Sequence, residues 1–155
     1  MSDNPGMGVL AQMLAGDDET PRVLCKAQGK VVKTIVKAER ERQCGEMGEG
    51  IDITFEDGYR IVIYDAGQSY CEERYMVIEE NLDDYIGMKF LGALVKEGKT
   101  EKDEEYCEVH EVQFLELQFD KCFLHIANHN EHNGCYGGFW IVARELDAQG
   151  EVIDN

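Results

Sequence analysis

The fold is decided by the stretch Ile51-Asp52-Ile53-Thr54-Phe55-Glu56-Asp57-Gly58-Tyr59-Arg60-Ile61-Val62-Ile63-Tyr64. Residues 51–55 alternate apolar and polar side chains, which is typical of a strand with one buried face. Residues 60–64 form a second apolar run, and Asp57-Gly58 between the two is a strong turn signal. The stretch therefore predicts a β-hairpin.

Similar runs on both sides of this hairpin predict a chain made mainly of strands. They cover residues 30–37, 69–78, 88–95, 106–119, 122–127 and 139–144. Residues 82–86 predict one short helix, because Asn81 can cap its start and Gly87 can end it. Residues 98–105 and the segment after residue 127 are expected to be loops.

These elements predict a mainly β (α+β) fold. We expect a single antiparallel, strongly curved sheet or half-barrel over the short helix. Residues 1–22 are expected to be a flexible N-terminal arm, residues 23–149 a single globular β-rich domain, and residues 150–155 a tail. The arm is either a frayed terminus or a segment that docks on a partner.

The long strand over residues 106–119 changes the phase of its apolar pattern. Val112 and Phe114 fall on one face, whereas Leu115, Leu117 and Phe119 fall on the other. Either a β-bulge interrupts the strand near residues 113–115, or the strand is covered on both faces. The bulge is the favoured interpretation.

The charge of the chain restricts its partners. Its 155 residues include 32 Asp/Glu and 15 Lys/Arg, which gives a formal net charge of −17. Residues 1–45 hold seven Lys/Arg and six Asp/Glu, whereas the rest hold eight and 26. So acidic a surface repels nucleic-acid phosphate and anionic lipid, so we expect no direct binding to nucleic acid or to a membrane. The acidity indicates either simple solubility or imitation of the charge of DNA.

Cysteine usage indicates the compartment. The six cysteines are Cys25, Cys44, Cys71, Cys107, Cys122 and Cys135. The chain has no CxxC pair, and its first residues lack the basic and apolar runs of a secretion signal. We therefore expect a cytoplasmic protein whose thiols are small buried apolar groups.

The stretch His129–Phe139, HNEHNGCYGGF, is the strongest candidate for a ligand site. Imidazole and amide groups supply hydrogen-bond donors and acceptors, and glycines let backbone N–H groups approach a ligand. We expect this stretch to share one rim of the sheet with residues 68–75, where Arg74 would pair with an anion. The alternative is only a tight turn followed by core aromatics. The candidate ligand-binding residues are Gln68, Glu72, Arg74, Tyr75, His129, Asn130, His132, Asn133 and Tyr136.

Metal binding and catalysis are less favoured interpretations. His125, His129, His132 and Cys135 would form an acceptable zinc set. However, His125 and His129 would lie roughly 13 Å apart along a strand, so the chain would have to bend before His129. No strand–turn–helix elbow surrounds Cys71 or Cys135, which disfavours a cysteine nucleophile. We therefore expect no metal, no cofactor and no catalytic residue.

Several segments, in this order, carry a resemblance to a known family. After the hairpin come GQSYCEERYM (67–76), LDDYIGMKF (82–90), EVHEVQFL (108–115) and NHNEHNGCYGGF (128–139). Over residues 30–145 the chain resembles a domain-of-unknown-function family of small phage and prophage proteins. Members often have a Cys-Cys-Glu run where this chain has Tyr70-Cys71-Glu72, and paired tyrosines of which Cys135 replaces the first. The resemblance implies a phage accessory gene and no particular activity.

Together these features predict a non-enzymatic, phage-associated protein in the host cytoplasm or in the virion. Its expected partner is a small polar or nucleotide-like ligand, such as a host defence signal that it sequesters. A protein-interaction role is the first alternative, as a virion component or as an acidic inhibitor that uses the N-terminal arm. A metal- or cysteine-dependent hydrolase is the second. Homo-oligomers are compatible with either binding role.

Overall fold

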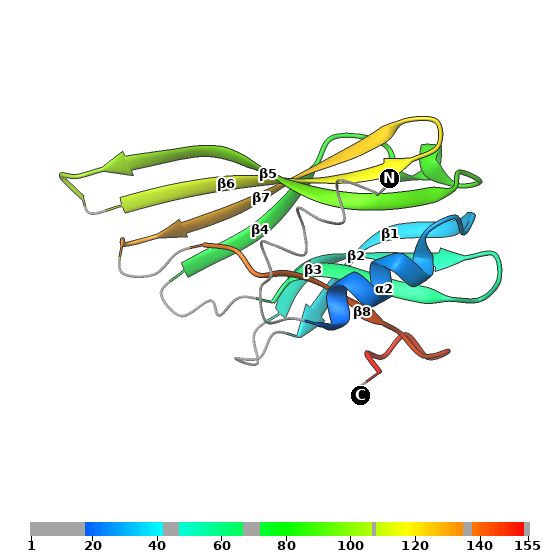
Figure 1. Ribbon diagram of the computed structural model, residues 1–155. Coiled ribbons are helices and arrows are strands. Elements are labelled where there is room, and N and C mark those ends of the chain that lie inside the picture. Colours follow the sequence, from blue (N-terminus) through cyan, green and yellow to red (C-terminus); the bar gives the residue numbers. More distant parts are fainter. Residues whose placement is uncertain (1–17, 42–46, 67–71, 107, 135–137, 154–155) are drawn as a thin grey trace.

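A computed structural model describes residues 18–41, 47–66, 72–106, 108–134 and 138–153. These residues form one α-helix, one 3₁₀-helix and eight strands (Figure 1). The helices are α2 (Glu19–Ala27) and η1 (Leu82–Tyr85). The strands are β1 (Val32–Glu41), β2 (Met47–Phe55), β3 (Arg60–Asp65), β4 (Glu72–Ile78), β5 (Phe90–Asp103), β6 (Glu108–Phe119), β7 (Phe123–His132) and β8 (Ile141–Glu145).

The strands form two antiparallel sheets that lie in two layers (Figure 1). One sheet has the order β1-β2-β3-β8, and the other has the order β4-β7-β6-β5. The mainly β class is confirmed, but the single, strongly curved sheet is wrong. The physical reason is that two sheets each have an apolar face, which one short helix cannot cover, so the two faces cover each other. The buried core includes Phe55, Phe90 and Phe119.

The predicted hairpin is confirmed as β2 and β3, with Ile53 opposite Ile61. Asp57 accepts a hydrogen bond from the backbone N–H of Tyr59, and Gly58 has a φ of 94°, which strongly favours glycine. The short helix is also confirmed as η1, where the Asn81 side chain accepts a hydrogen bond from the N–H of Asp83.

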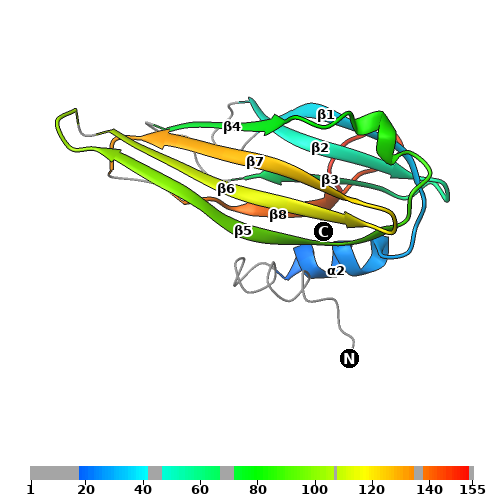
Figure 2. The ribbon, with the colours of Figure 1, turned by 90° about the horizontal axis from the view of Figure 1, so that it is seen from above.

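Helix α2 was not predicted from the sequence. It begins at Glu19, within the segment expected to be an arm, and it buries Val23, Leu24 and Ala27 in the core. It lies along the side of the sandwich where β5 and β8 are the edge strands (Figure 2). Thr20 Oγ1 accepts a hydrogen bond from the N–H of Ala143, so the helix also covers a polar group of β8.

The bulge expected near residues 113–115 of β6 is wrong. Strand β6 pairs with β7 without a register shift, and the irregularities lie in β5, between Phe90 and Gly92 and between Glu97 and Thr100. Strand β6 therefore carries apolar residues on both faces. The expected loops at 98–105 and after residue 127 are also largely wrong, because β5 continues to Asp103 and β7 to His132.

Strands β5, β6 and β7 extend beyond the other sheet, and we call residues 97–103, 108–113 and 128–132 the overhang (Figure 1). The face that continues the core is called the inner face, and the opposite one the outer face. Along the inner face of β7, Leu124 and Ile126 are followed by Asn128, Asn130 and His132. The inner face thus changes from apolar to polar where the overhang begins.

Among the described residues, no helix is long and apolar enough to span a membrane. Cys25 and Cys122 are free and exposed, so the expectation of buried thiols is wrong for these two. The other four cysteines lie outside the described residues.

Candidate functional site

The two segments expected to share a rim do lie side by side. Strands β4 and β7 pair antiparallel, with Glu72 opposite His132, Arg74 opposite Asn130, and Tyr75 opposite His129. Paired residues of neighbouring strands point to the same face, and successive residues point to opposite faces. The candidates are therefore divided between the two faces of this sheet, with Glu72, Arg74, Asn130 and His132 on the inner face and Tyr75 and His129 on the outer face.

Arg74 is buried between two carboxylates. Its Nη1 lies 2.9 Å from Asp65 Oδ2, and its Nη2 lies 2.9 Å from Glu72 Oε1, with all three side chains at most 6% exposed. Burial disfavours the charged guanidinium, but Asp65 and Glu72 outweigh this effect and raise the pKa of Arg74. A ligand anion would therefore have to displace one of these carboxylates to reach Arg74.

Asn130 links this ion-pair cluster to the segment that precedes β8. Its Nδ2 donates to Glu72 Oε2 and to the carbonyl oxygen of Gly138, both at 2.9 Å. Asp65 also accepts a hydrogen bond from the N–H of Trp140. The Oδ1 of Asn130 is fully buried and has no hydrogen-bond partner among the described residues. The cluster therefore ties β3, β4, β7 and the segment before β8 together at the start of the overhang.

Glu111 and His132 form a second polar pair on the inner face. Glu111 Oε1 accepts hydrogen bonds from His132 Nε2 at 2.7 Å and from the N–H of Gly138 at 2.9 Å. His132 Nδ1 accepts a hydrogen bond from the N–H of Gly134. Because Nδ1 accepts and Nε2 donates, this ring is a neutral imidazole with a fixed tautomer.

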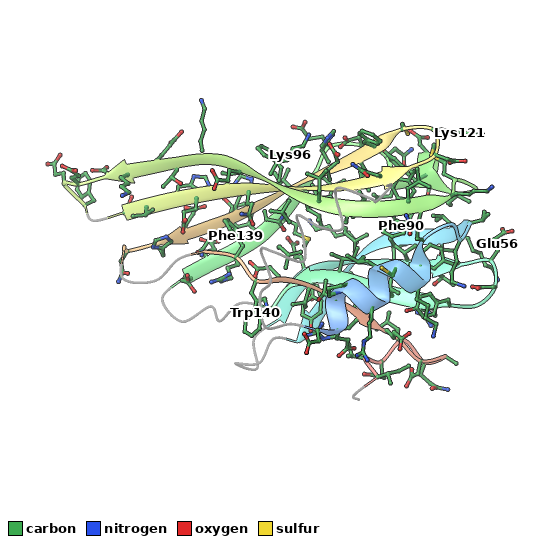
Figure 3. All side chains as sticks on the ribbon, viewed as in Figure 1. Glu56, Phe90, Lys96, Lys121, Phe139 and Trp140 are labelled. Atoms are coloured by element: carbon green, nitrogen blue, oxygen red, sulfur yellow. The ribbon has the colours of Figure 1, made fainter. Side chains whose placement is uncertain are left out.

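An open hollow of about 1030 Å³ lies against the Glu111–His132 pair. Its lining includes Thr100, Glu108, Glu111, His132, Asn133 and Gly138. A smaller hollow of about 360 Å³ adjoins it and is lined by Glu111, Gly138 and Phe139. Figure 3 shows Phe139 beneath the overhang, at the entrance to the space between the sheets.

The outer face holds a cluster of rings. The Tyr75 and His129 rings are stacked in parallel with their centroids 4.7 Å apart. His129 Nδ1 lies 2.9 Å from Nε2 of His110. Burial and the neighbouring His110 lower the pKa of His129. Tyr75 and His129 therefore belong to a different surface from the hollow.

Several candidates are not brought together. Gln68, Tyr136 and Cys135 lie outside the described residues, and Asn133 is exposed beside the hollow. His125 and His129 point to the outer face, whereas His132 points to the inner face. Among the described residues, no group of three or more His, Cys, Asp or Glu could hold a metal ion.

Sequence reasoning missed Asp65, Glu111 and Gly138. A signal existed for two of them. Asp65 directly follows the apolar run of β3 and is buried, and Glu111 lies in phase with Leu115 and Leu117 on the inner face of β6. The role of Gly138 depends on its backbone N–H and C=O, for which the sequence carries no side-chain signal.

No curated protein and no solved structure matches the chain. Residues 28–142, most of the described two-sheet domain, match a family described as a domain of unknown function, DUF7448. The description of this family names no function. The match confirms a domain-of-unknown-function family and does not bear on a phage or prophage origin. The chain belongs to the DUF7448 family.

Proposed function

We propose that this protein is a non-enzymatic, phage-associated accessory protein that binds a small polar, nucleotide-like ligand and sequesters it. The observation that carries the proposal is the Glu111–His132 pair, held by the backbone of Gly134 and Gly138 against an open hollow. A cytoplasmic defence signal of the host is the kind of ligand that such a protein would remove.

The inner face suits a ligand with a ring and several polar groups. A volume of about 1030 Å³ is large enough for a nucleoside with one or two further groups. Phe139 offers an aromatic face, and Thr100, Glu111 and Asn133 offer polar groups around the hollow. Because Glu111 and His132 are already fixed by hydrogen bonds, little conformational entropy would be lost when a ligand binds.

The charge around the hollow limits how the ligand lies. Its lining holds one lysine, Lys102, and four acidic side chains. The acidic residues are Asp103, Glu104, Glu108 and Glu111. Phosphate groups are repelled by this lining, whereas hydroxyl and amino groups can donate to it. We therefore place the base and sugar of the ligand in the hollow, with any phosphate towards solvent.

The state of His132 favours binding over proton transfer. A general base needs a ring nitrogen that can accept a proton from the substrate. In His132, Nδ1 already accepts the Gly134 N–H and Nε2 donates to Glu111. The imidazole therefore acts as a fixed part of the wall.

A thermal-shift panel of nucleosides, nucleotides and cyclic dinucleotides tests the proposal. A ligand at 100 times its Kd should stabilise the protein by about 2.7 kcal/mol. Chromatography of the recovered ligand should show it unchanged. Glu111→Gln should weaken binding by about tenfold or more, because it removes a charged acceptor at the wall. The matched control, Glu56→Gln in the β2–β3 turn, should leave the affinity unchanged.

Three results would reject the proposal. The first is chemical conversion of the ligand by the purified protein. The second is the absence of any stabilising compound in the panel. The third is a binder whose affinity Glu111→Gln does not alter.

A further inference from the structure

The outer face of the overhang carries an apolar groove that the proposed ligand site does not use. It has a volume of about 620 Å³, and we call it the outer groove. Its floor consists of Gly98, His110, Val112, Phe114, Ala127 and His129. Phe114 is 37% exposed there although it lies in the middle of β6. An exposed phenylalanine beside a valine and an alanine is unusual on the solvent side of a sheet and is typical of an interaction surface.

The floor of the outer groove is built by close packing. A Cβ atom at Gly98 would lie 2.4 Å from the carbonyl oxygen of Val112 and 3.1 Å from a ring carbon of Phe114. The bulge in β5 thus brings its backbone directly against β6 at this point. At the other side, His129 is fixed by its stack on Tyr75 and by its contact with His110. The groove is therefore preformed, which lowers the cost of binding.

The rim of the outer groove is acidic. Glu101 lines it, and Glu73 lies opposite Glu131 on the same face. Glu73 and Glu101 have no partner of opposite charge within the described part of the chain. The nearby Lys96 pairs with Glu116, which leaves Lys99 as the cation of the lining. Exposed carboxylates around an apolar floor complement a ligand that is both basic and apolar.

We propose that the outer groove docks a basic segment of a partner protein, with an apolar side chain over Val112 and Phe114 and Lys or Arg at the acidic rim. A second copy of this chain fits less well, because the same carboxylates would face each other on two chains of charge −17. This partner site is separate from the ligand hollow on the inner face, so either proposal can fail alone.

The test uses a lysine–leucine amphipathic peptide as the probe and the full chain as the receptor, with binding measured by fluorescence anisotropy. The same peptide with Glu in place of each Lys should bind at least about tenfold more weakly. Raising the salt concentration from about 50 to about 200 mM should weaken binding of the basic peptide by about fivefold or more.

Variants of the protein locate the binding. Phe114→Ser and the double variant Glu73→Gln/Glu101→Gln should each weaken binding of the basic peptide by about fivefold. Matched controls on the other sheet are Val36→Ser, which changes a residue that is 50% exposed, and Glu39→Gln/Glu56→Gln. They should change the affinity less than about twofold.

Four results would overturn the proposal. The acidic peptide binds as tightly as the basic one, or the control variants weaken binding as much as the groove variants. Sedimentation velocity shows a dimer that Phe114→Ser dissociates, so that a second copy is the occupant. Deletion of residues 1–17 increases the affinity for the basic peptide by about tenfold, so that the chain's own N-terminal segment is the occupant.

Discussion

The two halves of the β4-β7-β6-β5 sheet differ in what their inner faces carry. In the half that covers the other sheet, Leu115 and Leu117 of β6 pack with Leu124 and Ile126 of β7, and all four are fully buried. In the overhang, the same two strands present Glu111 and Gln113 opposite Asn130 and Asn128. The register is continuous across the boundary, so the difference is one of side-chain chemistry alone.

This difference shows how one pair of strands serves two purposes. Apolar inner residues gain free energy when a second sheet excludes water from them. Beyond the edge of that sheet the inner positions are polar although several of them are still buried, and side chains such as Asn130 hydrogen-bond with Glu72 and with the backbone of Gly138. The boundary between the halves is where Arg74, Asp65 and Glu72 form their buried ion pairs.

Replacing Arg74 with methionine removes the cation of the polar half and should give the largest loss of unfolding free energy. The side chain keeps much of its volume, but Asp65 and Glu72 are left buried without their cation. Loss of one partner of a buried ion pair costs about 3–5 kcal/mol. Urea denaturation measures the free energy of unfolding. The exposed Lys121→Met serves as the control and should change it by less than about 0.5 kcal/mol. A loss below about 1 kcal/mol for Arg74→Met would show that the cluster is not structurally important.

Replacing Leu117 with alanine creates a cavity in the covered half and should give a slightly smaller loss of unfolding free energy. A buried leucine changed to alanine loses its transfer free energy and leaves a cavity, at a cost of about 3 kcal/mol. The hollow under the overhang is lined by other residues, so binding of any ligand found there should keep its Kd. If Leu117→Ala instead weakened ligand binding as strongly as Glu111→Gln, the two halves would not be independent.

Much of this comparison was predictable from the sequence, and the rest has physical causes. Alternation in residues 51–64 gave the hairpin, and the same period-two rule places Glu111 and His132 on the inner face. The second sheet was missed because alternation shows that a face is buried but not what covers it. The extension of β5 to Asp103 was missed because its residues are charged, and a strand exposed on both faces has no apolar signal.

The site itself was only partly predictable. The two segments were expected to share one rim of the sheet, but their pairing as strands β4 and β7 was not predicted. Their division between two faces was missed because residues 129–132 were taken as loop, whereas strand geometry sends His129 and His132 to opposite sides. Asp65 reaches Arg74 from the other sheet, a contact that no local pattern indicates.

Glu116 is a polar exception within the covered half, on its outer face, and it predicts a pH dependence. Burial raises the pKa of its carboxyl, but hydrogen bonds from Gln118, Lys96 and His125 outweigh burial and lower the pKa to about 2. A lowered pKa stabilises the folded state above the ordinary pKa of glutamate, and this stabilisation is lost as the pH falls from about 4.5 to about 2. The difference in unfolding free energy between the native protein and Glu116→Gln should therefore shrink by about 1–2 kcal/mol over that range. A difference that stays constant with pH would contradict this role.

Tyr75 gives the smallest effect and examines the outer face of the overhang. Its hydroxyl donates to Glu131 Oε2 at 2.5 Å, and this hydrogen bond, with burial second, raises the pKa of Tyr75 to about 12. The stabilisation is complete below the ordinary pKa of tyrosine and is lost as the pH rises through about 12. Because the pair is exposed, Tyr75→Phe should cost no more than about 0.5 kcal/mol near neutral pH.

The ultraviolet absorbance of tyrosinate, taken as the difference between the native protein and Tyr75→Phe, isolates the ionisation of the Tyr75 phenol. In Glu131→Gln the same difference titration should move down towards pH 10, because a neutral amide no longer opposes the phenolate. If the midpoint of the Tyr75 titration stays near pH 12 in Glu131→Gln, burial and not Glu131 raises the pKa of Tyr75. The ring cluster of Tyr75 and His129 would then be less accessible to water than this structure indicates.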